Sequence, residues 1–261
     1  MKRIVVGDVH GNEPRFMELM DKLEVPASVA DRQEKGIEVI QLGDFLNLGY
    51  GQLEVDFYEA CRMYVDIVLI GNHELPEVAP NPQRVRFLGY EGRDMDAAKL
   101  YMDDFDNGRV HGCAYAVGDW LITHAGVSKS RLGDFIDIER PARVIADELN
   151  VRFSNWVNKG EPEMGDFSIF EDQGSIFWCR GLNYEYIDNN FHNPLKQIIG
   201  HTPQVQAGTP QSYVCESGRF FIIDIGAKVS LDNGIAALVT EDDGETWELH
   251  EVAGTHERGT V

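Results

Sequence analysis

Near its start the chain carries the stretch Ile4-Val5-Val6-Gly7-Asp8-Val9-His10-Gly11-Asn12. Its short run of β-branched residues ends in a carboxylate and an imidazole flanked by glycines, which predicts a buried strand with polar groups at its carboxyl end. Helical patterns follow at Glu13–Leu23, with Pro14 in the first turn, and at Leu53–Met63. Strands interleaved with helices in this way predict an α/β protein with mixed sheets.

The same pattern recurs four times along the chain. An apolar run precedes each of the motifs Gly43-Asp44, Gly71-Asn72-His73-Glu74, His124-Ala125-Gly126 and Gly200-His201-Thr202-Pro203. Ligands of open α/β sheets bind outside the carboxyl ends of the strands. We therefore expect these motifs to converge in space despite their separation in the sequence.

The residue types in these motifs suit a pair of divalent metal ions. Carboxylate, imidazole and amide oxygen together accept Mn, Fe, Zn or Mg, and the mixed set does not choose between them. Two metals about 3.5–4 Å apart provide a nucleophilic hydroxide at neutral pH and offset charge on phosphoryl oxygens. The motifs therefore favour a two-metal site for the hydrolysis of a phosphate ester.

Together with Gly7-Asp8-Val9-His10-Gly11, the four motifs resemble, in order, the five signatures of the calcineurin-like metallophosphoesterases. His201 is followed by Pro203 where many phosphodiesterase relatives carry a second histidine, and this is similar to the phosphoprotein phosphatase branch. Two further segments resemble the bacterial and phage type of that branch, Ile176-Phe177-Trp178-Cys179-Arg180 and Ile223-Asp224-Ile225-Gly226-Ala227. That branch includes serine/threonine phosphoprotein phosphatases and symmetrical diadenosine tetraphosphatases. The resemblance implies an α/β fold of two stacked mixed β-sheets flanked by helices.

The resemblance also implies a dinuclear centre. It puts one divalent ion on Asp8, His10 and Asp44 and the other on Asp44, Asn72, His124 and His201, with Asp44 as the bridge. Manganese is the ion we expect, and iron, zinc, magnesium or nickel are alternatives. His73 matches the histidine that protonates the leaving-group oxygen. Arg180 matches an arginine that grips the phosphoryl group, a role that suits a planar guanidinium.

The second motif departs from the family's pattern. It continues as Gly43-Asp44-Phe45-Leu46-Asn47-Leu48-Gly49, whereas the family continues to an aspartate, an arginine and a glycine. Asn47 replaces a carboxylate that orients and charges His73, and Leu48 replaces a second phosphate-binding arginine. An asparagine orients an imidazole by hydrogen bond, but it does not stabilise an imidazolium as a carboxylate does. We therefore expect a weaker general acid and looser monoester binding, which shifts some preference toward diesters.

Three functions stay open at this point. The sequence favours a metal-dependent hydrolase of phosphate monoesters, similar to a serine/threonine protein phosphatase. One alternative is a dinucleoside polyphosphate hydrolase or a phosphodiesterase. Another is a metal-binding interaction protein with impaired turnover, which Asn47 and Leu48 permit. Retention of His73 favours an enzyme, because a binding protein has no need of a leaving-group acid.

Further elements are expected between and after the motifs. Pro141–Trp156 predicts a helix, and Asn233-Gly234 predicts a hairpin turn between Phe220–Ile225 and Ile235–Val239. Asp224 lies at the end of the first of these two runs and is as consistent with a turn as with the site. Because the motifs run through nearly the whole length, we expect residues 1–261 to form a single metallophosphoesterase domain, with 253–261 as a frayed tail.

Composition limits the partners and the compartment. The chain of 261 residues has a net charge of −21, which disfavours nucleic acid and membrane surfaces. A phosphorylated protein, or a small phosphate ester or nucleotide, is the expected substrate. No apolar segment approaches the length of a membrane span, and the four cysteines are too widely spaced for a paired motif. Both features predict a cytoplasmic protein with reduced thiols.

Overall fold

The computed structural model describes most of the chain. The described residues are 1–46, 52–85, 95–127, 135–159, 167–171, 175–179, 195–202, 204–206, 209–214, 219–225 and 234–252. Several residues named above lie outside these ranges, namely Asn47, Leu48, Gly49, Arg180, Pro203, Gly226, Ala227 and Asn233. The tail 253–261 also lies outside them, so its predicted fraying stays a prediction.

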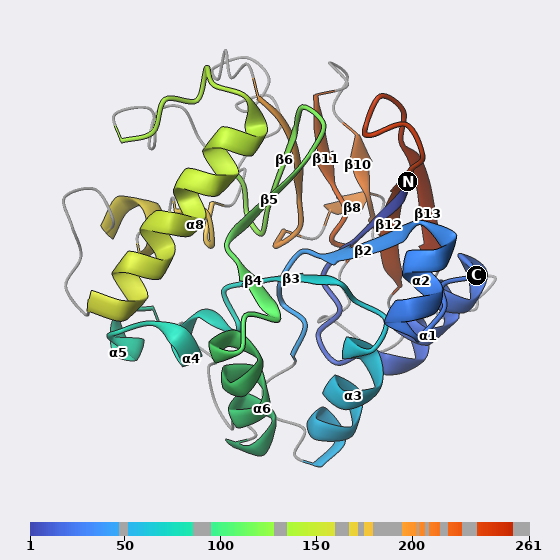
Figure 1. Ribbon diagram of the computed structural model, residues 1–261, viewed down its shortest axis with the longest axis horizontal. Coiled ribbons are helices and arrows are strands. Elements are labelled where there is room, and N and C mark those ends of the chain that lie inside the picture. The colour runs from blue at the N-terminus through green and yellow to red at the C-terminus, as the bar shows by residue number, and fades with distance from the viewer. Residues whose placement is uncertain are drawn as a thin grey trace.

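The first sheet has six strands in the order β13-β12-β1-β2-β3-β4 (Figure 1). They are β1 (Lys2–Val6), β2 (Ile37–Gln41), β3 (Ile67–Leu69), β4 (Val110–Gly112), β12 (Ile235–Thr240) and β13 (Glu248–Val252). β1 to β4 run parallel, whereas β12 pairs antiparallel with both β1 and β13. The β-branched residues of the central strands suit burial on both faces, as parallel strands require.

The second sheet has five strands in the order β10-β11-β7-β6-β5. They are β5 (Ala114–Val117), β6 (Trp120–Thr123), β7 (Lys196–Ile199), β10 (Tyr213–Val214) and β11 (Phe220–Ile222). β6, β7 and β11 run parallel and the two edge strands run antiparallel to their neighbours, so this sheet is mixed as well. A separate two-stranded ribbon pairs β8 (Gln204–Gln206) with β9 (Thr209–Gln211).

One apolar core joins the faces of the two sheets. Val5, Ile40 and Leu69 come from the first sheet, and Ile122 and Ile198 come from the second; all five pack in the same buried cluster. The predicted α/β fold of two stacked mixed β-sheets flanked by helices is confirmed.

Helices connect the parallel strands and cover the sheets. The described helices are α1 (Glu13–Lys22), α2 (Val29–Lys35), α3 (Gln52–Arg62), α4 (Leu75–Val78), α5 (Pro82–Val85), α6 (Met95–Asp106), α8 (Ala142–Lys159) and a π-helical turn at Phe167–Glu171. α1 and α2 cross from β1 to β2, and α3 crosses from β2 to β3. α1 and α3 confirm the helices predicted at Glu13–Leu23 and Leu53–Met63. α8 confirms the helix predicted at Pro141–Trp156 and packs beside β5 and β6 (Figure 1).

The hairpin predicted between Phe220–Ile225 and Ile235–Val239 is wrong. β11 pairs parallel with β7 in the second sheet, whereas β12 pairs antiparallel with β1 in the first. Each apolar run finds a partner from a distant part of the chain, so adjacency in sequence does not decide the pairing. The hairpin that does form joins β12 to β13, and its turn includes Asp243 at φ 61° and Gly244 at φ 88°.

Two expectations from composition are tested by the described residues. The described cysteines, Cys61, Cys113 and Cys179, carry free thiols, as predicted. None of the described helices has the length and apolar character that a membrane crossing demands.

A buried arginine anchors α2 to the first sheet. The Arg32 side chain is fully buried, and its Nη2 donates to Asp66 Oδ1 at 2.8 Å. Its Nη1 donates to the carbonyls of Pro26, Ala27 and Met63. Asp66 Oδ2 also accepts a hydrogen bond from the backbone N–H of Val39 in β2 at 2.9 Å. The pair therefore holds the end of the first crossover in place.

We predict that Asp66→Ala lowers the free energy of unfolding by about 3–5 kcal/mol, because the Arg32 guanidinium then stays buried without its anionic partner. The midpoint and slope of urea denaturation give this quantity. As a control, Asp21→Ala removes an exposed aspartate from α1 and should change stability by less than about 0.5 kcal/mol. Equal losses in the two variants would contradict the anchoring role.

Candidate metal centre

Five loops bring the predicted ligands together at the carboxyl ends of strands in both sheets. Asp8 and His10 follow β1, Asp44 follows β2, Asn72 follows β3, His124 follows β6 and His201 follows β7. All six side chains are buried. The backbone N–H of His201 donates to Asp8 Oδ2 at 2.9 Å across 193 residues of sequence, so the two sheets meet at the site itself.

One cluster joins Asn72, His124 and His201. Asn72 Oδ1 lies 2.9 Å from His124 Nε2 and 2.8 Å from His201 Nδ1. The two imidazoles approach each other at 3.1 Å, and His124 Nε2 lies 3.5 Å from Asp44 Oδ1. One amide oxygen, two ring nitrogens and one carboxylate oxygen therefore surround a common point, which suits a single divalent ion.

The second cluster lies on the other side of Asp44. Asp44 Oδ2 is 3.5 Å from His10 Nε2 and 3.9 Å from His73 Nε2. Asp8 Oδ2 lies 4.0 Å from the same nitrogen of His10. Asp44 thus turns one carboxylate oxygen to each cluster, which is the arrangement that a bridging ligand needs.

Three of these residues adopt backbone conformations that L-amino acids disfavour. His10, Asp44 and His201 have φ values of 49°, 52° and 67°, in the left-handed region. Each such residue costs about 1–2 kcal/mol, and strain of this kind gathers at functional sites. The Asp44 carbonyl accepts hydrogen bonds from the N–H groups of Val9 and His10, which helps to hold the loops in place.

Glycines beside the ligands allow the loops to approach. A Cβ atom on Gly71 would overlap Asp44 Oδ1, and one on Gly200 would overlap Asp8 Oδ1. Neither of these two glycines has a positive φ, so the reason for glycine is space and not backbone conformation. The glycines that precede Asn72 and His201 in the sequence motifs are therefore required by the packing of the site.

The protonation of the ligands fits a divalent ion. Burial, followed by the charges of Asp224 and Asp44, raises the pKa of Asp8 well above its usual value, while the His201 N–H lowers it. Burial lowers the pKa of His124 to about 3, so this imidazole is neutral near pH 7 and offers a lone pair. Asp8 Oδ1 is buried and accepts no hydrogen bond from the described part of the chain. A dication would satisfy that oxygen and reverse the charge repulsion.

Glu74 lies beside the site, and sequence reasoning assigned it no role. Its buried carboxylate accepts three backbone hydrogen bonds, from Asp44, Leu46 and Gly71. Burial and the charge of Asp44 raise the pKa of Glu74 to about 8, and the three N–H donors lower it. The available signal was the glutamate that ends the Gly71-Asn72-His73-Glu74 motif, but two of its three partners, Asp44 and Leu46, lie on a different loop.

Other predicted residues are placed less completely. Asp224 is buried and its charge acts on Asp8, which places it near the site. The Trp178 ring meets the His201 ring edge to face, with centroids 5.9 Å apart. Asn47 and Arg180 lie outside the described residues, so their predicted roles stay predictions.

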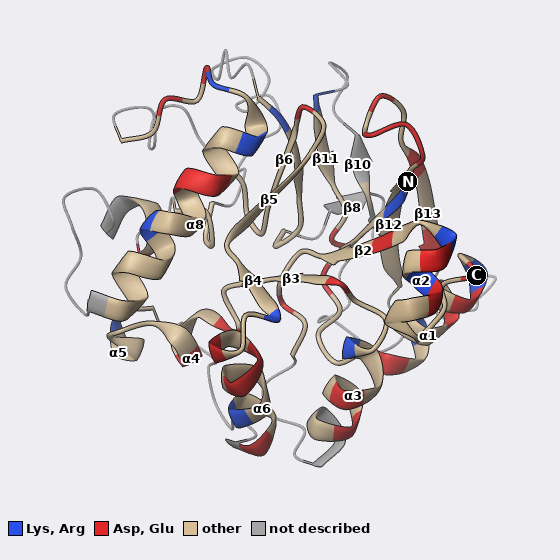
Figure 2. Ribbon diagram, in the orientation of Figure 1, with Lys and Arg blue, Asp and Glu red and all other residues tan. Residues whose placement is uncertain are grey.

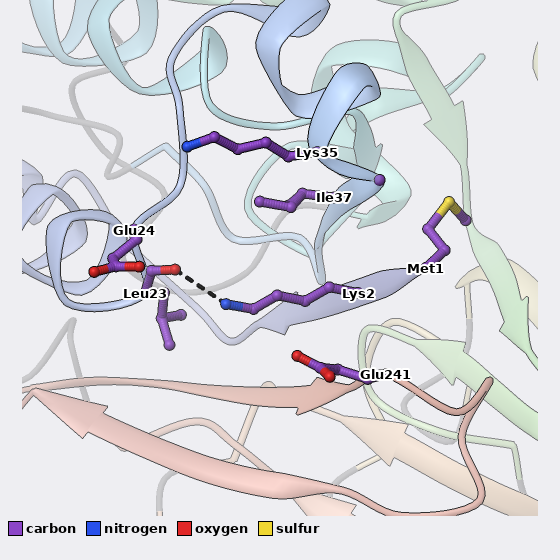
Figure 3. Close-up of a pocket in the computed structure, with 8 residues that line it drawn as sticks. Met1, Lys2, Leu23, Glu24, Lys35, Ile37 and Glu241 are labelled. Atoms are coloured by element: carbon purple, nitrogen blue, oxygen red, sulfur yellow. Dashed lines mark hydrogen bonds between the residues drawn. The ribbon is translucent and has the colours of Figure 1, made fainter.

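A hollow of about 620 Å³ lies away from the two ligand clusters (Figure 3). It is lined by Met1, Lys2, Leu23, Glu24, Lys35, Gly36, Ile37 and Glu241. Lys2 and Ile37 begin β1 and β2, whereas Asp8 and Asp44 follow the other ends of these strands. Lys2 Nζ is held by the Leu23 carbonyl at 3.1 Å. The hollow is therefore separate from the ligand clusters.

Comparison with known proteins identifies one family. The family model described as calcineurin-like phosphoesterase matches residues 1–208, a span that contains all six clustered residues and His73. No curated protein matches the chain.

We predict that Gly200→Ala weakens the binding of divalent metal by roughly tenfold or more, because the added methyl group displaces the Asp8 carboxylate. Isothermal titration of manganese into metal-free protein measures the affinity. The matched control is Gly36→Ala, which has open space around it but a φ of 63°. That variant should lose about 1–2 kcal/mol of stability and keep its metal affinity. Unchanged affinity in folded Gly200→Ala would exclude Asp8 as a ligand.

Proposed function

The chain belongs to the calcineurin-like phosphoesterase family, and we propose that it is a dinuclear hydrolase of phosphate monoesters, acting as a serine/threonine protein phosphatase. Membership makes it a metallophosphoesterase. The observation that carries the dinuclear proposal is Asp44, whose two carboxylate oxygens face two separate ligand clusters. The monoester preference is supported by the single histidine of the Gly200-His201-Thr202-Pro203 motif, since many phosphodiesterase relatives carry a second one there.

The proposed ligand sets share Asp44. One ion is assigned to Asp8, His10 and Asp44, and the other to Asp44, Asn72, His124 and His201, with manganese as the expected metal. When bound, such a pair would lower the pKa of a bound water, so that a hydroxide is available to attack phosphorus at neutral pH, and would offset charge on the phosphoryl oxygens.

We assign to His73 the role of general acid, which donates a proton to the leaving-group oxygen. Its backbone N–H donates to Asp44 Oδ1 at 2.9 Å, and its ring meets the His10 ring edge to face with centroids 4.7 Å apart. These contacts hold the imidazole beside the cluster without using it as one of the six assigned ligands. We assign to Asn47 the orientation of His73, and to Arg180 the binding of the phosphoryl group, on the basis of the family resemblance.

One specific feature favours a second candidate function. Leu48 stands where relatives in the phosphatase branch carry a second phosphate-binding arginine, and a dianionic monoester gains most from two arginines. A dinucleoside polyphosphate hydrolase or a phosphodiesterase is therefore the alternative. A metal-binding interaction protein with impaired turnover is the third candidate.

Surface charge restricts the proposed substrates. Figure 2 shows acidic residues along α1, α2, α3 and α6, in keeping with the net charge of −21. Such a surface repels extended polyanions, so we expect neither nucleic acid nor a membrane as partner. A phosphorylated side chain, or a small phosphate ester or nucleotide, fits a local positive field from two metal ions.

We expect manganese-dependent hydrolysis of p-nitrophenyl phosphate at a higher initial rate than of bis(p-nitrophenyl) phosphate. The protein is stripped of metal and then reloaded with manganese, and both rates are measured before and after reloading. A faster rate on the diester would replace the phosphatase proposal with the diesterase alternative. No turnover of either ester by manganese-loaded protein would favour the interaction protein.

We predict that His73→Asn lowers kcat on phenyl phosphate by roughly 10²–10⁴-fold, because the poor leaving group depends on a general acid. The loss on p-nitrophenyl phosphate should be smaller. Metal content, measured in the same samples, should stay at the wild-type value. The control His250→Asn changes a histidine of β13 and should change neither quantity. Loss of one metal ion in His73→Asn would make His73 a ligand together with His10 and Asp44.

A further inference from the structure

Glu74 is a fully buried carboxylate placed between the loops that follow β2 and β3. Its Oε2 accepts hydrogen bonds from the N–H of Asp44 at 2.9 Å and of Gly71 at 3.0 Å. Its Oε1 accepts a hydrogen bond from the N–H of Leu46 at 2.9 Å. A single side chain therefore satisfies backbone donors on both loops.

The loops that Glu74 joins are in direct contact. A Cβ atom on Gly43 would overlap the backbone of Gly71, and a Cβ atom on Gly71 would overlap the backbone N–H of Asp44. Buried N–H groups that lose their acceptor each cost about 1–3 kcal/mol, so the three bonds to Glu74 are strongly retained.

The geometry of Asp44 depends on these bonds. Asp44 has a φ of 52°; its backbone N–H donates to Glu74, and its carbonyl accepts from the N–H groups of Val9 and His10. With the backbone fixed at both ends, its carboxylate turns Oδ1 toward His124 and Oδ2 toward His10. A small rotation of the Asp44 backbone would move Oδ1 or Oδ2 of its carboxylate away from the cluster that it faces.

We propose that Glu74 is a positioning residue for the bridging carboxylate, and that it acts by the shape of its hydrogen bonds and not by its negative charge. The inference rests on the proposed dinuclear function. Among the assigned ligands, the Glu74 side chain accepts a hydrogen bond from the backbone N–H of Asp44 and is not itself assigned to either metal ion. Its part in the reaction is to keep both oxygens of Asp44 available at once.

Two substitutions separate shape from charge. Glu74→Gln keeps the length, so the amide oxygen can still accept from Asp44 and Gly71, while its NH₂ group faces the Leu46 N–H. Glu74→Asp keeps the charge but is one methylene shorter and cannot reach both loops. If shape decides, the glutamine variant should bind manganese more tightly than the aspartate variant. If charge decides, the aspartate variant should bind more tightly.

The experiment is a titration of manganese into metal-free protein, with electron paramagnetic resonance of the loaded samples. We expect manganese affinity to fall roughly tenfold in Glu74→Gln and roughly 100-fold in Glu74→Asp, the range found for changes around metal ligands. The resonance signal of a coupled manganese pair should persist in the glutamine variant and disappear in the aspartate variant. Thermal unfolding of the metal-free proteins shows that each variant is folded.

The matched control is Glu171→Asp, which shortens another buried carboxylate whose partners are Trp156 and Arg84. Its manganese affinity should equal that of the wild type. An aspartate variant at position 74 that binds as well as, or better than, the glutamine variant overturns the proposal, as does wild-type affinity in both. Wild-type protein that binds two ions and hydrolyses no ester contradicts the proposed function alone, because the ranking of the variants does not depend on turnover.

Discussion

Repulsion among buried carboxylates is the constraint on which the site depends. The pKa of Asp8 is raised by the negative charges of Asp224, Asp44 and Glu74. All four carboxylates are buried. Like charges buried together oppose folding unless hydrogen bonds or cations offset them. Backbone N–H groups offset part of this cost, three of them at Glu74, one at Asp44 and one at Asp8. The repulsion that these hydrogen bonds do not offset favours the binding of a doubly charged cation over a neutral ligand.

The sheets deliver these groups by a general property of parallel strands. Carboxyl ends of neighbouring parallel strands share one edge, so β1, β2 and β3 present their loops together. β6 and β7 do the same in the second sheet. The N–H of Gly200 donates to the His124 carbonyl at 2.8 Å, which fixes the two loops of that sheet to each other. Stacking the sheets then places two rows of strand ends face to face.

The sequence allowed the fold class and the convergence of six side chains to be predicted, because each motif ends an apolar run of strand length. It did not reveal the hydrogen bonds of Glu74, because its bonds to Asp44 and Leu46 depend on the distance between two loops. The false hairpin at Asn233-Gly234 has a related cause, since β11 and β12 belong to different sheets and each pairs with a strand distant in sequence. The division of Asp44 between two clusters was accessible only through the family resemblance, because spacing does not specify which way an oxygen points.

The place of β1 in its sheet has a consequence for biosynthesis. β1 lies between β2 and β12, and its antiparallel neighbour begins at Ile235. A chain emerging from the ribosome therefore exposes one edge of its first strand until most of its residues have been made. Contacts of such high sequence separation slow folding and leave nascent sheets open to aggregation. The cluster of Asp44, Asn72, His124 and His201 depends on His201 in the same way, so we expect its metal ion to bind only after most of the chain has been made.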